Sequence, residues 1–167
     1  MITQEEVLKL FEYKDGNLYW KVSTSPIVKV NSLAGTINGQ GRKQIGINYK
    51  IYGIHRIIFL MFHGYMPKEI DHIDGNPLNN AIENLREATR SEQLCNTKLR
   101  KDCTSGIKGV MWHKLMKKWL VRVYKNNKLV YKNYFDDLEF AELVAIEARN
   151  KYHKEFARWL LQSNISL

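Results

Sequence analysis

Residues 69–100 read EIDHIDGNPLNNAIENLREATRSEQLCNTKLR and combine secondary-structure signals with a dense set of polar side chains. Residues 69–72 have the pattern of a short strand that runs into an Asp-Gly-Asn-Pro turn at 74–77. A second short strand is predicted at 84–87. A Thr-Arg-Ser-Glu capping box then predicts a helix at about 90–100. The predicted local order is therefore strand, loop, strand, helix.

Carboxylate, imidazole and amide side chains gather in this segment. Asp71 is a hard oxygen ligand of the kind that Mg²⁺ prefers, and the neighbouring His72 can activate a water molecule. Adjacent side chains point to opposite faces of a strand, so both serve one site only near a strand end, which the following turn supplies. Gln93 and Asn96 share one helix face, and either amide can complete a metal shell. Taken singly, each residue also fits a surface pair or a turn; only the combination favours phosphodiester chemistry.

Positive charge is concentrated in residues 98–132. This segment holds eleven lysines and arginines against one acidic residue, a net charge of +10, whereas the whole chain carries +9. Tryptophans and tyrosines are interleaved with these basic residues. A merely solvated lysine face is one interpretation, but such a block is more typical of a surface that binds a polyanion. It reads as strands and turns rather than as a basic amphipathic helix, which disfavours a membrane surface.

Composition narrows the class of protein. A chain of 167 residues suffices for one ordinary domain or for two to three very small ones. The longest apolar run, 57–62, is far shorter than the ~20 residues that span a bilayer, and acidic residues near the N-terminus argue against a secretory signal. Two cysteines, Cys95 and Cys103, are too few for a disulfide framework or a structural zinc site. We expect an intracellular, reduced protein with no membrane partner.

The regions on either side of the polar segment are predicted to form further modules. Residues 1–53 read as a capped helix, a hairpin with an Asp-Gly turn, and short glycine-punctuated strands at 43–47 and 50–53. An apolar helix is predicted at 54–62. The expected fold class is α+β, in which this β-rich N-terminal module precedes the strand-loop-strand-helix core.

Beyond residue 105 the chain is predicted to form a three-stranded antiparallel sheet packed on one long helix. The strands are predicted at 109–113, 119–124 and 129–135, and the helix from an N-cap at Asp136 to about Leu161, with Phe140, Leu143, Val144 and Tyr152 facing inward. The predicted domains are therefore 1–53, 54–104 and 105–167.

The polar segment resembles the HNH endonuclease family in its phage homing-endonuclease branch. The resemblance spans roughly residues 50–100 and includes His55-Arg56, the Asp71–Asn76 stretch, Asn79-Asn80, Asn84-Leu85-Arg86 and Thr89–Asn96. It implies a ββα-metal fold in which His72 is the general base, Asp71 a ligand of one divalent ion, and Asn84 the residue that holds the loop. The ion is expected to be Mg²⁺, with Mn²⁺ as the alternative. In this branch the last ligand is usually an Asn nine residues beyond the central Asn; Gln93 stands there, with Asn96 in reserve.

The C-terminal module resembles the Apetala/ethylene-response-factor DNA-binding domain over residues 105–157. The resemblance is carried by Gly109-Val110, Lys118-Trp119, Tyr134-Phe135 and the helix start at 136–145. It implies that one face of the sheet enters a DNA groove, whereas Trp119 packs in the core. The residues expected to contact DNA are Arg86, Lys108, Met111, His113, Lys114, Lys117, Arg122, Tyr124, Lys128 and Tyr131.

The sequence therefore predicts a phage or mobile-element HNH endonuclease that acts on double-stranded DNA in the cytoplasm of a bacterial or phage-infected cell. Cleavage of one strand by a monomer and of both strands by a homodimer remain open. A catalytically inactive DNA-binding regulator is the first alternative, since Gln93 departs from the usual ligand. An RNA-directed nuclease is the second, because phosphate and aromatic chemistry does not distinguish the two polymers.

Overall fold

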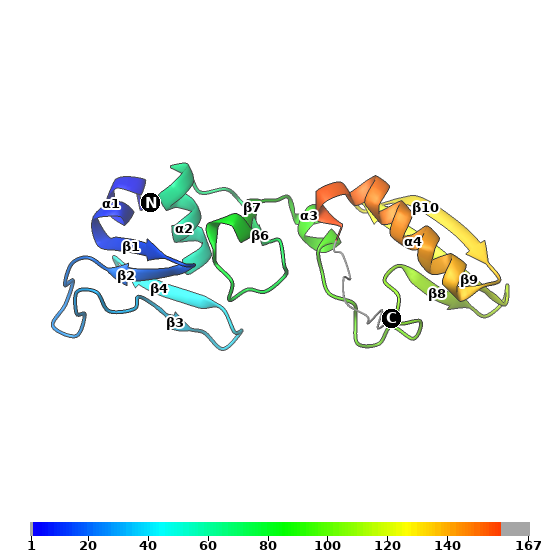
Figure 1. Cartoon of the computed structure of the whole chain (residues 1–167), viewed down its shortest axis with the longest axis horizontal. Coiled ribbons are helices and arrows are strands. Elements are labelled where there is room, and N and C mark those ends of the chain that lie inside the picture. The colour runs from blue at the N-terminus through cyan, green and yellow to red at the C-terminus, as the bar shows by residue number, and fades with distance from the viewer. Residues whose placement is uncertain (1, 158–167) are drawn as a thin grey trace, which may run out of the picture. The chain divides into compact units, whose positions relative to one another are not determined.

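The computed structural model describes residues 2–157, which form an α+β fold, as predicted (Figure 1). The chain divides into two compact units, residues 1–89 and 90–167. In the described part, the first unit holds small antiparallel sheets and two α-helices, and the second holds a three-stranded sheet packed on one long helix. The three domains expected from the sequence stay a prediction. No helix within the described part is long and apolar enough to cross a membrane.

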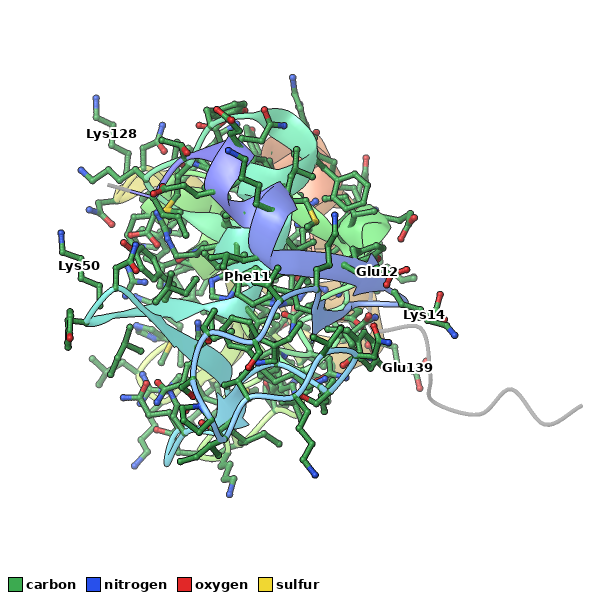
Figure 2. The ribbon with its side chains drawn as sticks, turned by 90° about the vertical axis from the view of Figure 1, so that its left-hand side faces the viewer. Phe11, Glu12, Lys14, Lys50, Lys128 and Glu139 are labelled. Carbon is green, nitrogen blue, oxygen red and sulfur yellow. The ribbon has the colours of Figure 1, made fainter. Side chains whose placement is uncertain are left out.

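A capped helix opens the first unit. Helix α1 (Gln4–Leu10) has Thr3 as its N-cap and Glu6 as the partner in a reciprocal capping box, as predicted. The hydrogen bonds of this box lower the pKa of the Glu6 carboxyl. Phe11 follows directly, where α1 passes into the first strand (Figure 2), and is 1% exposed. The capping box thus fixes where α1 begins, and the short helix places the buried ring of Phe11 at its end.

The predicted hairpin comes next. Strands β1 (Phe11–Lys14) and β2 (Asn17–Trp20) pair antiparallel across the Asp-Gly turn, where both turn residues have positive φ. Gly16 at this turn lies against Ala81, since a Cβ on Gly16 would stand 2.7 Å from the Ala81 nitrogen. The hairpin therefore supports the polar loop from one side.

A second antiparallel sheet has the strand order β3-β4-β5. It consists of β3 (Thr36–Ile37), β4 (Lys43–Ile47) and β5 (Lys50–Gly53). The last two strands were predicted; β3 was missed because two residues leave no alternation to recognise. Helix α2 (Ile54–His63) follows β5 directly and ends at Gly64, which adopts φ 77° as its C-cap.

Strands β6 (Ile70–His72) and β7 (Leu85–Glu87) pair antiparallel, and the 3₁₀-helix η1 (Ile82–Asn84) precedes β7. Ile70 and Leu85 are 5% and 6% exposed and belong to the same hydrophobic core as α1, α2 and the hairpin. Burial of these two side chains anchors the short ladder to the rest of the unit.

The second unit begins with helix α3 (Arg90–Cys95), which is shorter than predicted. The prediction that this helix reaches Arg100 is wrong. The ammonium of Lys108 donates to the carbonyls of Cys95 and Thr97 at 2.8 and 2.6 Å. Those contacts satisfy carbonyls that a longer helix would have bonded internally, so the helix stops there.

The three-stranded sheet of the second unit has the order β10-β9-β8. Strands β8 (Val110–His113), β9 (Lys118–Lys125) and β10 (Lys128–Phe135) pair antiparallel, as predicted. The turn between the last two is formed by Asn126 and Asn127, at φ 51° and 59°. Asparagine tolerates this left-handed region better than most residues, which explains why an Asn pair closes the hairpin.

Helix α4 (Leu138–His153) lies along this sheet (Figure 1). Its N-cap is Asp137, one residue later than predicted, because the Asp137 carboxylate accepts the N3 amide hydrogen bond at 2.6 Å. The helix also ends earlier than predicted and passes into the 3₁₀-helix η2 (Lys154–Phe156). The predicted end at Leu161 lies outside the described residues.

The side chains that α4 buries against the sheet are small, which corrects the prediction that its large apolar residues face inward. Phe140 and Leu143 are 55% and 64% exposed, whereas Ala141 and Ala145 are fully buried. Val144 and Tyr152 are half-buried. Alanines let the helix approach the sheet closely, so the large apolar residues of this helix do not mark its buried stripe.

Candidate active site

The short ladder of β6 and β7 sets the positions of the predicted catalytic residues. Its register pairs Asp71 with Arg86 and His72 with Leu85. His72 is the last residue of β6, and its carbonyl accepts the Gly75 N–H at 2.8 Å. The backbone therefore leaves strand geometry directly after His72. A strand end is the condition under which two neighbouring side chains can serve one site.

Asn84 ties the loop between the two strands together. Its Nδ2 donates to Asp74 Oδ1 at 2.9 Å and to the Asn79 carbonyl at 2.8 Å, and its Oδ1 accepts the Asp74 N–H at 3.0 Å. Burial alone raises the pKa of Asp74, but hydrogen bonds from Asn76, Asn79 and Asn84 outweigh it and lower that pKa. The loop is thus built on a charged carboxylate. A role for Asn84 in catalysis stays a prediction.

A buried amide contacts the imidazole of His72. Asn80 Oδ1 lies 2.9 Å from His72 Nε2, and Asn80 is only 1% exposed. An amide oxygen only accepts hydrogen bonds, so Nε2 is the donor in this contact. Asn80 Nδ2 is buried without a hydrogen-bond partner among the described residues. The sequence placed Asn80 in the motif but assigned it no function, because several asparagines of this loop look alike.

His55 forms a second imidazole at this site. Its ring centroid lies 5.4 Å from that of His72, with the ring planes tilted by 55°. Burial lowers the pKa of His55 to about 4, and the neighbouring His72, Arg42 and Arg56 lower it further. His55 is therefore neutral near pH 7. The ring also packs over Gly53, where a Cβ would stand 2.5 Å from it.

Asp71 forms an ion pair with Arg86 across the ladder. The guanidinium Nε and Nη2 atoms both donate to Asp71 Oδ2, at 3.0 and 2.8 Å. The two side chains are only 10% and 16% exposed. In the structure the guanidinium of Arg86 binds the carboxylate of Asp71, and the expected contact of Arg86 with DNA stays a prediction. Removal of either partner would leave a buried charge without its counter-ion.

The two candidate amide ligands belong to the second unit. Gln93 lies on α3, and its Oε1 accepts from Arg90 Nη1 at 3.3 Å. Asn96 follows the last residue of α3 and donates its backbone N–H to the Glu92 carbonyl at 3.2 Å. The predicted pairing of one of these amides with Asp71 stays a prediction.

The chemistry of the donor set fits a hard divalent cation. Asp71 offers a carboxylate, and Gln93 or Asn96 would add an amide oxygen, which are ligands that Mg²⁺ and Mn²⁺ accept. Among residues 2–157, no group of three or more His, Cys, Asp or Glu side chains is placed to hold a metal ion.

The predicted DNA-contacting residues lie mainly on one face of the second unit's sheet, which we call the outer face. Alternation and register place on it the side chains Met111, His113, Arg122 and Tyr124. Buried Val110, Val121 and Val123 define the opposite face, under α4. On the outer face, Arg122 Nη2 contacts Met111 Sδ at 2.8 Å, and its guanidinium lies 6.0 Å from the Tyr124 ring centroid.

Exposed lysines surround the outer face. Lys114 and Lys117 lie in the β8–β9 turn, and Lys128 begins β10 and extends away from the ribbon (Figure 2). All three are exposed. Their ammonium groups are thus placed where a polyanion could reach them.

Two of the predicted DNA contacts have other positions. Tyr131 lies on the core side of the sheet, since it pairs with Val123 and packs against the buried cluster, so its assignment to the outer face is wrong. A register shift between Leu129 and Tyr131 reverses the alternation. Lys108 uses its ammonium to bind α3 carbonyls, as described above. Trp119 packs against the same cluster, as predicted.

Comparisons with known proteins agree with this arrangement. The HNH endonuclease family matches residues 52–94, which include α2, β6, the polar loop and β7. Protein 3.8 of Escherichia phage T7 is 38% identical over 122 residues, which cover 71% of this chain and 98% of that protein. No solved structure matches the chain. The chain therefore belongs to the family of phage T7 protein 3.8, and it carries an HNH endonuclease domain at residues 52–94.

Proposed function

We propose that this protein is a divalent-metal-dependent endonuclease of the phage homing type that hydrolyses phosphodiester bonds in double-stranded DNA. The observation that carries the proposal is the contact between His72 and Asn80. An imidazole at a strand end, held at 2.9 Å by an amide that is 1% exposed, is oriented for proton transfer. The match to the HNH endonuclease family over residues 52–94 supports the same reaction class.

In this proposal His72 is the general base. With Nε2 donating to Asn80, Nδ1 accepts a proton from the attacking water. Asn80 keeps the ring in one tautomer and one orientation, so the lone pair does not have to be reoriented for each turnover. The neutral His55 beside it adds no positive charge that would oppose protonation of His72. The neighbouring residues thus favour a base that gains a proton during the reaction.

Asp71 would hold the cation, together with Gln93 or Asn96. The ion, Mg²⁺ first and Mn²⁺ second, would stabilise negative charge on the phosphate and on the leaving oxygen. Arg86 fixes the orientation of the Asp71 carboxylate through its two hydrogen bonds. Asn84 and Asp74 hold the intervening loop in shape.

The outer face of the second unit would hold the duplex. Lysines position a protein on phosphates without reading bases, so we propose modest sequence specificity. The likeness to the Apetala/ethylene-response-factor domain suggests that the sheet enters the groove, with Met111, His113, Arg122 and Tyr124 toward the bases. With one active site per chain, a monomer would nick, and cleavage of both strands would need two copies or two events.

Replacement of His72 by Ala tests the catalytic assignment. We expect plasmid nicking in Mg²⁺ to fall about 10²–10⁴-fold, with duplex affinity within about two-fold of native because the outer face is untouched. His63→Ala is the matched control: this histidine is exposed at the end of α2 and contacts Phe59 and Tyr65 rather than the loop. It should nick like the native protein.

Two results would contradict the proposal. Undiminished nicking by H72A would remove His72 as the base. Native protein that binds DNA but remains inert with every divalent ion would favour the DNA-binding regulator. Competition between duplex DNA and RNA of equal length in the same assay identifies the substrate, and preferential cleavage of RNA would favour the RNA-directed nuclease.

A further inference from the structure

A pocket of about 230 Å³ opens within the second unit, at residues that the nuclease proposal does not use for chemistry. It is bounded by α3, by the part of β9 that extends past the start of β8, and by the C-terminal end of α4. We call it the basic pocket. Its lining includes Cys95, Lys108, Arg122, Val123, Arg149 and His153. No aspartate or glutamate lines it among the described residues.

Arg149 is a buried cation on the wall of this pocket. It is 8% exposed, and its one hydrogen bond to another described residue runs from Nη1 to the Lys108 carbonyl at 2.9 Å. No carboxylate of residues 2–157 lies within ion-pair distance of it. Burial lowers the pKa of Arg149, and the nearby charge of Glu142 only partly opposes this. Arginine nevertheless stays charged in proteins, so within residues 2–157 the fold keeps a desolvated cation without an ion-paired carboxylate.

His153 adds an unsatisfied atom to the same wall. The ring is 9% exposed, its Nε2 donates to the Tyr124 carbonyl at 2.9 Å, and its Nδ1 is buried without a partner in the described part of the chain. Burial lowers the pKa of His153, the Tyr124 hydrogen bond raises it, and Lys108, Arg149 and Lys125 lower it. A buried ring nitrogen without a hydrogen-bond partner is destabilising, because it has lost its contact with water.

These costs are offset if an anion occupies the pocket. A bound phosphate would accept hydrogen bonds from the Arg149 guanidinium, which is shaped for planar, two-point contact with such oxygens. It would also give His153 Nδ1 a partner, either through a P–OH donor or through a proton taken up by the ring. The cavity shares Arg122 and Tyr124 with the outer face, whereas the buried Arg149 and His153 come from α4.

We propose that the basic pocket binds a phosphate group, carried either by a free nucleotide or by the backbone of a nucleic acid. Its volume lies below the roughly 300–1,000 Å³ of sites for drug-sized ligands, so it suits one phosphate with a small attached group. Val123 and the thiol of Cys95 offer apolar contact beside the cations. This inference does not rest on the proposed nuclease activity.

The test uses the full chain and three probes: inorganic phosphate, thymidine 5′-monophosphate and a short DNA duplex. Each is titrated while the NMR signals of the Arg149 Nε–H group and the His153 ring are followed. We expect at least one probe to shift both signals saturably. Arg149→Met should weaken that probe about ten- to hundred-fold. Lys151→Met is the matched control, since Lys151 is an exposed cation on the same helix whose ammonium lies over Tyr152.

Each outcome decides the inference. In the first outcome, phosphate or the mononucleotide shifts the signals saturably. If Arg149→Met loses these shifts and Lys151→Met retains them, the result supports a site for free phosphate groups. Shifts with the duplex alone, lost in the same variant, support a contact with the nucleic-acid backbone. If none of the probes shifts these signals, or if Arg149→Met binds like the native chain, the inference is wrong. Should Arg149→Met fail to fold, His153→Gln is scored by the same criteria.

Discussion

The active-site loop and the outer face of the C-terminal sheet are both rich in polar side chains, but they are built in opposite ways. In and beside the loop between β6 and β7, Asp71, His72 and Asn80 are at least nine-tenths buried and contact specific partners. On the outer face, Lys117 and Lys128 are exposed. This difference is the one we expect if the first region transfers protons, which needs fixed atoms, and the second holds a polyanion, which needs mainly charge density.

The largest contrast between the two regions is expected for their arginines. Arg86→Met removes the partner of buried Asp71 and should lower the free energy of unfolding by about 3–5 kcal/mol. Arg122→Met, on the outer face, should change it by less than about 0.5 kcal/mol. Urea unfolding of both variants with EDTA present measures the two values.

A second variant separates charge from packing in this comparison. Asp71→Asn combined with Arg86→Met removes both charges, so it should recover much of the stability that Arg86→Met loses. Equal losses for Arg86→Met and Arg122→Met would show that the ion pair contributes little, and the contrast between the regions would then rest on hydrogen bonding alone.

The next effect in size depends on pH and belongs to the buried region. His55 has a pKa of about 4 in the folded protein, below its usual 6.5. Between these values the unfolded chain binds a proton that the folded chain does not, so stability is lost as pH falls through this window. The loss should approach about 2 kcal/mol by pH 4.5, somewhat less than the full shift allows.

His55→Gln tests this assignment, because glutamine does not titrate. Urea unfolding of the native protein and the variant at pH 7.5, 6.0 and 4.5 should show a smaller decline in the variant. Parallel curves for the two proteins would mean that another group causes the acid sensitivity.

Local signals made much of the fold predictable from the sequence. The capping box at Thr3 and the Asp-Gly turn at 15–16 depend on residues within one turn of each other. Each was predicted correctly because the residue types that favour these conformations are few.

The predictions that failed depend on contacts between distant residues. Helix α3 stops at Cys95 because Lys108, thirteen positions later, takes its carbonyl. The face of the sheet on which Tyr131 lies depends on a register shift in β10, and no residue type in the sequence indicates that shift. In the loop, the sequence cannot tell which asparagine meets His72, since Asn76, Asn79, Asn80 and Asn84 offer the same amide group.

The smallest effect should come from the amide that the sequence could not single out. Asn80→Ala removes the acceptor of His72 Nε2, so both tautomers and more ring orientations become populated. We expect kcat for plasmid nicking to fall about ten-fold, roughly 1.4 kcal/mol, with KM unchanged. Asn133→Ala, an exposed amide on β10 of the second unit, is the matched control and should leave kcat unchanged.

The pH profile shows whether Asn80 acts through His72 or only supports the loop. In Asn80→Asp a carboxylate would face the ring and favour the imidazolium, so the pKa on the acidic limb of the nicking profile should rise. A purely structural role would lower the rate in both variants and leave the pKa of the acidic limb unchanged. An upward shift in Asn80→Asp, with near-native kcat on the alkaline side, would identify Asn80 as the residue that positions the base.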